Sequence, residues 1–145
     1  METLVDVLKD PARSRVVVAD GVRMIDDEVH ARGGLSGLAL KAGYKAVRTI
    51  KPNVIEEALG MLLPEFAPAV DPFLITGRAE GDVRAYFKKN DHAIANALLG
   101  VTDRKRKNSK NPVIKRAYDG LRPQAERLTV EAVPRLADLI LRHVK

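Results

Sequence analysis

The sequence has no cysteine and no tryptophan, and it has only three tyrosines and three phenylalanines. Without cysteine the chain has no disulfide, no cysteine-ligated zinc or iron–sulfur site, and no thiol nucleophile. So few aromatic side chains offer no evident platform on which single-stranded bases could stack. The missing residue types therefore exclude thiol redox chemistry and give no support to a stacking type of nucleic-acid binding.

Long apolar runs are missing as well. The longest uninterrupted apolar run has four residues, Val16–Ala19, whereas a membrane-spanning helix needs about 20. Residues 1–10 carry acidic side chains where a signal peptide carries basic ones. We therefore expect a cytoplasmic protein with no membrane partner.

The composition that is present suits one globular domain over residues 1–145, with 46% hydrophobic and 30% charged residues. The net charge of +6 is unevenly spread: residues 1–75 hold 9 Lys and Arg against 11 Asp and Glu (net −2), and residues 76–145 hold 16 against 8 (net +8). Charge balance bears on partners rather than on fold. The basic half is thus a candidate surface for an anionic partner, although the two halves could also attract each other.

Three helix starts are predicted from an Asx residue followed by proline, at Asp10-Pro11, Asp71-Pro72 and Asn111-Pro112. The Asx side chain accepts a hydrogen bond from an unpaired backbone N–H, and the proline has no N–H to lose. After the first of these starts, apolar residues recur at helical spacing until Gly33-Gly34 stop the helix. A strand at Val16–Val18 is the alternative, but no second strand is present to pair with it.

A second helix is expected from Ser36 to about Ile50, and a third from Pro52. Prolines recur every four residues within 64–75, and an interior proline removes a hydrogen bond and clashes with the preceding turn. This stretch is therefore predicted to form short turns or a distorted helix, with a kink or hinge.

Residues 77–81 are expected to form a flexible loop between the acidic and the basic half. Further helices are predicted around residues 83–87, around 91–101, from 112, and as a final pair after Pro123 with a break at Pro134. The pattern as a whole predicts an all-α protein, a single compact irregular bundle of seven to nine helices, several of them short and begun by proline.

Familiar catalytic and metal-binding patterns are not found. His30, His92 and His143 lie far apart, and none has a second histidine one turn away. A convergence of His30 with Asp26 and Asp27 in space stays open as an alternative. We predict no metal, no cofactor and no catalytic residue, and therefore a protein that is not an enzyme.

Glycines surround the start of the second expected helix, in the run Gly34-Leu35-Ser36-Gly37. Their spacing matches neither the nucleophile elbow of hydrolases nor the phosphate loop. Glycines at a helix N-terminus still expose backbone N–H groups that bind anions. The candidate anion site comprises Gly34, Ser36, Gly37 and Lys41, and the alternative is a simple helix stop followed by a new N-cap.

Two basic features favour phosphate binding. No acidic residue lies between Glu28 and Glu56, and in this interval Lys41, Lys45 and Arg48 are spaced as one stripe along a helix. The second cluster comprises Arg104, Lys105, Arg106, Lys107 and Lys110. Such clusters neutralise phosphates, but basic residues also gather at helix ends without binding anything.

Small residues form a third candidate surface on the second expected helix, at Ala39, Gly43 and Ala46. A glycine in mid-helix is unfavourable by roughly 0.5–1 kcal/mol relative to alanine. We therefore expect Gly43 to be buried at a helix–helix crossing, either within the chain or between two chains.

Several short motifs are spread along the chain. They are Gly34-Leu35-Ser36-Gly37 with Lys41, Gly43-Tyr44, Val47 and Ile50-Lys51-Pro52, then Ala97-Leu98-Leu99 with Val101-Thr102-Asp103, Ala117-Tyr118 with Leu121-Arg122, and Pro134-Arg135-Leu136. In these motifs the sequence resembles, over essentially its whole length, a family of small helical bacterial proteins that is common in actinobacteria and has no established function. The resemblance implies a stand-alone all-helical protein and supplies no activity, cofactor or catalytic residue.

We interpret the chain as a non-enzymatic helical interaction protein, self-association included, whose functional surface is the helix expected at 36–50. The first alternative is non-specific nucleic-acid or phosphate-anion binding, which requires the two basic patches to share one face. The second alternative is a small-molecule binder or enzyme with an interhelical pocket lined by Tyr44, Tyr86 or Tyr118.

Overall fold

The computed structural model describes residues 1–145 apart from the side chain of Ser36. Over this described backbone the chain forms seven α-helices and no strand. The helices are α1 (Leu4–Leu8), α2 (Pro11–Ala31), α3 (Gly34–Arg48), α4 (Val54–Ala79), α5 (Val83–Lys89), α6 (Asp91–Asn108) and α7 (Pro112–His143). The predicted all-α class and number of helices are confirmed. The short α1 was not predicted.

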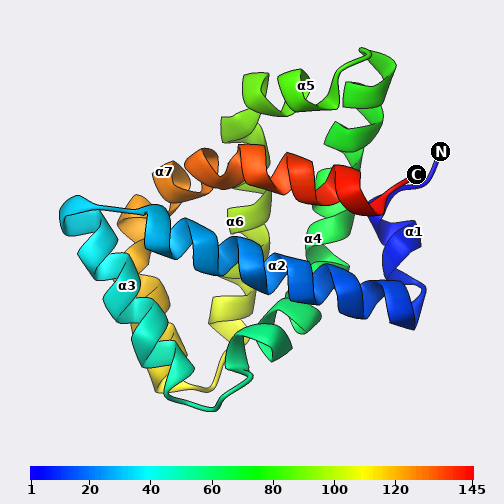
Figure 1. Cartoon of the computed structure of the whole chain (residues 1–145). Helices are drawn as coiled ribbons and strands as arrows, with labels where there is room; N and C mark the ends of the chain where they lie inside the picture. The colour runs from blue at the N-terminus through cyan, green and yellow to red at the C-terminus, as the bar shows by residue number, and fades with distance from the viewer.

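The helices cross one another rather than running parallel. In Figure 1, α2 and the C-terminal part of α7 pass in front of α4 and α6, with α3 at the left of the molecule and α5 at the top. α2 contacts α4 and α7, and α6 contacts the same two helices. The two termini lie close together.

The core collects side chains from every helix except α3. Its largest fully buried side chains include Val7 of α1, Val17 of α2, Leu74 of α4, Phe87 of α5, Ile94 of α6 and Ile140 of α7. α3 contributes no buried hydrophobic side chain among the described residues. It is therefore the peripheral helix of the bundle, with much of its surface open to solvent.

Two of the three predicted Asx caps are confirmed. Asp10 begins α2 by accepting a hydrogen bond from the backbone N–H of Ala12 at 3.0 Å, and Asn111 begins α7 by accepting one from Val113 at 2.9 Å. The predicted start at Asp71 is wrong, because Asp71 lies inside α4 and is buried. The predicted helix after Asp10-Pro11 is confirmed, and the alternative of a strand at residues 16–18 is excluded, since these residues belong to α2.

The prolines distort helices but do not end them. α4 continues through Pro64, Pro68 and Pro72, and its ribbon changes direction along its length in Figure 1. α7 continues through Pro123 and Pro134, so the predicted final pair of helices with a break at Pro134 is wrong. All five prolines are exposed. Water can therefore bind the carbonyls that lose their partner, and the helices bend instead of breaking.

The turn between α4 and α5 is shorter than expected. Gly77 belongs to α4 and is buried, and a Cβ added to it would lie 3.2 Å from Cα of Val83 and 3.3 Å from Cβ of Tyr86. The connection is thus reduced to residues 80–82, where Gly81 has a φ of +89°. Asp82 then caps α5 by accepting a hydrogen bond from Ala85 N–H at 3.0 Å.

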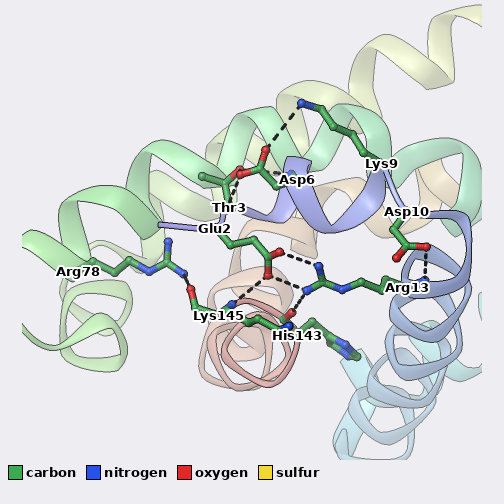
Figure 2. Close-up of polar contacts among 9 residues, drawn as sticks. All are labelled: Glu2, Thr3, Asp6, Lys9, Asp10, Arg13, Arg78, His143 and Lys145. Carbon is green, nitrogen blue, oxygen red and sulfur yellow. Dashed lines mark hydrogen bonds and ion pairs between the residues drawn. The ribbon is translucent and has the colours of Figure 1, made fainter.

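A polar clamp ties the two ends of the chain to α2 (Figure 2). The Arg13 guanidinium donates two hydrogen bonds of 2.6 Å to the Glu2 carboxylate and one of 2.8 Å to the carbonyl of His143. Glu2 also accepts a hydrogen bond of 3.0 Å from the backbone N–H of Lys145. Sequence reasoning missed this clamp because its members are remote in sequence.

Candidate functional site

Two glycines turn the chain from α2 into α3. Gly34 has a φ of +68°, a conformation that favours glycine. A Cβ added to Gly37 would lie 2.7 Å from the backbone carbon and oxygen of Arg32. The N-cap of α3 is Gly33. The helix therefore begins before Ser36, where the sequence analysis placed its start. These glycines therefore serve the tight connection between α2 and α3.

The inner side of α3 packs against α2 and α7. A Cβ added to Gly43 would lie 3.3 Å from Leu121 Cδ1 and 4.0 Å from Ala117 Cβ, both on α7. Gly43 thus lies at a helix crossing within the chain, as expected, although it is half-buried rather than buried. Ala39 and Ala46 are exposed and do not take part in this crossing. One helical turn before and one turn after Gly43, larger half-buried side chains of α3 must therefore form the side that packs against α7.

The outer side of α3 carries an apolar stripe that nothing in the chain covers. Leu35 is 86% exposed, which is among the highest values for a large apolar side chain in this molecule, and Leu38 is 65% exposed. The residues of this stripe recur at helical spacing, and all are exposed: Leu35, Leu38, Ala39, Ala42 and Ala46. We call this set the apolar stripe of α3. The sequence analysis named only two residues of this stripe, Ala39 and Ala46. It placed them on the side of the helix that packs against another helix.

A groove of about 400 Å³ runs between α2 and α3, beside the apolar stripe. Its polar lining includes Asp26 and His30 of α2 and Lys41, Tyr44, Lys45 and Arg48 of α3. The structure thus brings the three residues of the predicted basic stripe to one groove. We call Lys41, Lys45 and Arg48 the α3 cations.

Asp26 is the only acidic residue lining this groove, within the part of the chain that is described. Its carboxylate lies 3.8 Å from Arg48 Nη1 and 3.6 Å from His30 Nδ1, and it accepts a hydrogen bond of 3.4 Å from the Tyr44 hydroxyl. The Arg48 guanidinium lies 5.5 Å from the centre of the Tyr44 ring, within cation–π range. Burial and the Asp26 carboxylate raise the pKa of Tyr44, so that its hydroxyl is a neutral hydrogen-bond donor.

Lys41 and Lys45 have no ion-pair partner among the described residues. The groove therefore holds two unpaired ammonium groups next to one neutralised pair. The alternative of a metal site at His30 and Asp26 gains nothing from this geometry, because the two side chains are an i, i+4 ion pair and no group of three metal-ligating side chains occurs among the described residues.

The second basic cluster is organised differently. Residues 104–108 form the last turns of α6, and only Ser109 to Asn111 form the connection to α7. Lys105 pairs with Glu65 of α4, and Arg106 donates hydrogen bonds of 2.9 and 2.6 Å to Asp119 of α7. Arg104, Lys107 and Lys110 are exposed. Part of this cluster therefore joins helices, and its charge is partly neutralised.

A polar network beside this cluster joins α6 to α7. Arg122 donates hydrogen bonds of 2.9 and 3.1 Å to Asp103, and the Tyr118 hydroxyl donates to Asp103 while lying 2.8 Å from the Thr102 hydroxyl. Arg122 and then Tyr118 lower the pKa of Asp103. This network was missed in the sequence because residues 102–103 and 118–122 meet only when α6 packs on α7.

The two basic patches lie on different sides of α7. Ala117 and Leu121 of α7 face Gly43 of α3, whereas Tyr118 and Arg122 contact α6. Over the described chain no Cα of α3 comes within 8 Å of a Cα of α6. The N-terminal part of α7 thus separates the α3 cations from the cluster at the end of α6.

The residues of the predicted anion site at the start of α3 differ in their exposure, and the site itself stays a prediction. Gly34 is exposed, Gly37 is buried against Arg32, and Lys41 faces the groove with α2. The side chain of Ser36 lies outside the described residues.

One helix of the described chain, α4, is long and apolar enough to cross a membrane by length and composition. Its most apolar 18-residue window has a mean hydropathy of 1.4 and is 33% buried. The count of uninterrupted apolar residues missed this because glycine, proline and acidic residues interrupt the run. α4 packs against α1, α2, α5 and α6 and carries buried Asp71, which is the setting of a central core helix. The absence of a membrane partner stays a prediction.

Comparison with known proteins agrees with the resemblance seen in the sequence motifs. No curated protein and no solved structure matches this chain. A family model does match, and its match covers residues 4–144. The chain therefore belongs to a family of unknown function, DUF6918.

Proposed function

We propose that this protein is a non-enzymatic interaction protein that binds an acidic amphipathic helix of a partner protein on the outer side of α3. The apolar stripe of α3 is the observation that carries the proposal. Exposed leucines and alanines at helical spacing match the way one helix lays its apolar face against another. The three alanines of the stripe would let the backbone of the partner helix approach closely.

Charge selects the class of partner. The α3 cations border the apolar stripe, and no acidic residue occurs in α3. A partner helix with acidic residues beside its apolar positions would pair with Lys41 and Lys45, which have no ion-pair partner within the described part of the chain. Electrostatic complementarity of this kind gives specificity and speeds association.

A second copy of the chain is a poorer occupant. In a symmetric dimer the same surface of both copies meets, and two apolar stripes of α3 would bring two sets of α3 cations together without an acid between them. Like charges placed opposite each other oppose association.

The experiment uses a labelled helical peptide with leucines at heptad positions a and d and glutamates at e and g, measured by fluorescence anisotropy at low salt. We expect micromolar binding by the wild type, at least tenfold weaker binding by Leu38→Asp, and a preference of the Lys41→Glu, Lys45→Glu double variant for the same peptide with lysines in place of the glutamates. Ile75→Asp is the matched control, because Ile75 is 54% exposed but lies on α4.

Three results would overturn this proposal. The first is no binding of the acidic peptide by the wild type, and the second is equal weakening by Leu38→Asp and Ile75→Asp. The third is evidence for a different occupant. If light scattering shows a dimer in the wild type but not in Leu38→Asp, the stripe binds a second copy of the chain. If the wild type binds anionic vesicles and Leu38→Asp does not, the stripe binds a lipid surface.

The groove between α2 and α3 favours a second candidate function, binding of a phosphate group. The α3 cations and His30 surround this groove, and only Asp26 opposes them. Phosphate contacts of this kind weaken steeply as salt rises. A labelled DNA duplex titrated across salt tests it: Lys41→Glu with Lys45→Glu should remove binding, and the uncharged change Leu38→Ala should leave it unchanged. Arg104→Glu with Lys107→Glu tests the other patch without breaking the pairs of Lys105 and Arg106.

A further inference from the structure

An apolar cavity of about 180 Å³ lies in the core, between α4 on one side and α2 and α7 on the other. No Cα of α4 lies within 8 Å of a Cα of α7 over the described residues. Side chains must therefore span the space between these two helices, and Leu63 of α4 and Ala132 and Leu136 of α7 are among those that line the cavity. The cavity is the part of this space that they leave unfilled.

Small residues explain why the space stays unfilled. Gly21 of α2 has no side chain, and a Cβ there would lie 2.5 Å from Leu59 Cδ2. Leu59 is therefore held over Gly21, and Ala132 on the facing side adds only a methyl group. Neither position supplies a side chain that reaches the middle of the cavity.

The surface of the cavity is apolar throughout. Thr129 is the single polar residue in its lining, and no polar atom contributes to the exposed lining surface. An enclosed water molecule needs two to four polar partners, and this lining does not provide them. The cavity therefore suits a hydrocarbon rather than water or a charged ligand.

The size of the cavity sets the size of the ligand, and its edge provides access. An apolar cavity of roughly 150 Å³ is large enough to hold benzene, so 180 Å³ corresponds to one aromatic ring or a short alkyl chain. Met24, Phe66 and Leu136 line the cavity and are only half-buried. Met24 is unbranched and adapts its shape easily, so a ligand can enter on its side without unfolding of a helix.

We infer that this core cavity binds an apolar hydrocarbon group of this size, either a free single-ring aromatic or the end of an alkyl chain. The site is separate from the outer side of α3, so each proposal stands or falls without the other.

The test adds toluene to the intact protein and follows its melting temperature and the methyl resonances of Leu63, Val133 and Leu136 by NMR. We expect saturable binding that raises the melting temperature and shifts these methyls, with naphthalene binding at least tenfold more weakly because it exceeds the cavity. Sodium octanoate is the second arm: competition with toluene assigns the site to alkyl chains as well, and absence of competition assigns it to rings.

Three variants decide whether the cavity is the site. Ala132→Leu and Leu136→Phe each fill it from α7, and each should weaken toluene binding at least tenfold while the protein still melts cooperatively. Thr129→Val keeps the volume and removes the hydroxyl, and binding should stay within twofold. The inference is overturned if saturating toluene changes neither the melting temperature nor the methyl resonances, if both filling variants bind as tightly as the wild type, or if Thr129→Val abolishes binding.

Discussion

The backbone N–H of Leu4 donates a hydrogen bond of 2.9 Å to Asp71 Oδ1, across 67 residues of sequence. The neighbouring N–H of Val5 donates one of 3.0 Å to the other oxygen of the same carboxylate. Thr3 accepts the next backbone N–H, that of Asp6. The first three donors of α1 are thus paired, two of them by a side chain from the middle of α4. This contact explains why a carboxylate can be buried in α4.

Asp71→Ala should lower the free energy of unfolding by about 2–4 kcal/mol, because it leaves one buried and one partly buried backbone donor without their acceptor. Asp71→Asn should lose less, since its amide keeps one acceptor oxygen. Urea unfolding measures both. An Asp71→Ala protein with the urea midpoint of the wild type would show that α1 does not depend on this cap.

Acid should weaken the clamp between the two ends of the chain. Arg13 lowers the pKa of Glu2 from its ordinary 4.5 to about 2 in the folded protein. A carboxylate whose pKa falls on folding stabilises the protein above pH 4.5, and this contribution disappears as the pH falls through about 2. Glu2→Gln should therefore reduce the difference between urea midpoints at pH 5 and pH 2.5.

The control for this pH dependence is Glu80→Gln, which changes an exposed acid without an ion pair among the described residues. It should leave the difference between the two midpoints unchanged. If Glu2→Gln and Glu80→Gln behave alike, the clamp does not contribute to acid sensitivity.

Gly43→Leu should destabilise the protein by about 1–3 kcal/mol, because the added side chain overpacks the crossing with Leu121. Gly43→Ala should be nearly neutral: the new methyl meets the movable end of Leu121 at 3.3 Å, and the gain in helix propensity offsets this tightness. Since the crossing lies within one chain, thermal unfolding of both variants should not depend on protein concentration. A concentration-dependent melting temperature would place the contact between chains.

Two neighbouring residues of α4 test the orientation of that helix. Leu74 has no exposed surface, whereas Ile75 is 54% exposed. Leu74→Ala should lower the free energy of unfolding by about 2–5 kcal/mol, and Ile75→Ala should change it by less than about 1 kcal/mol. Equal losses in chemical unfolding would mean that α4 is rotated or that Ile75 is covered by another molecule.

Local signals in the sequence were enough for much of the helical framework. Asp10 and Asn111 act within three residues of themselves, so the helix starts that they make can be read without knowing the rest of the fold. The same residue type failed at Asp71, because its carboxylate caps α1 from within α4 and the sequence does not show that α1 passes there.

The proline positions also show that a local signal in the sequence can be overridden by tertiary packing. An interior proline weakens a helix by a local effect of roughly 3 kcal/mol, and the sequence analysis therefore predicted short turns or a distorted helix at residues 64–75 and a break at Pro134. Packing of the apolar sides of α4 and α7 in the core opposes this local effect, and the exposed position of Pro134 and the other prolines lets water take the freed carbonyls.

In the candidate site, too, some features follow from the sequence and others only from the tertiary structure. The sequence by itself determined that α3 is a basic helix without acids and that Gly43 marks a contact, because both are properties of residue type and helical spacing. Only the tertiary structure decided which side of α3 meets α2 and α7, and so left Leu35 and Leu38 exposed, placed Asp26 beside Arg48, and put α7 between the two basic patches. Helical spacing states which residues share a side, but it does not state which side another helix covers, since that depends on where residues distant in sequence pack.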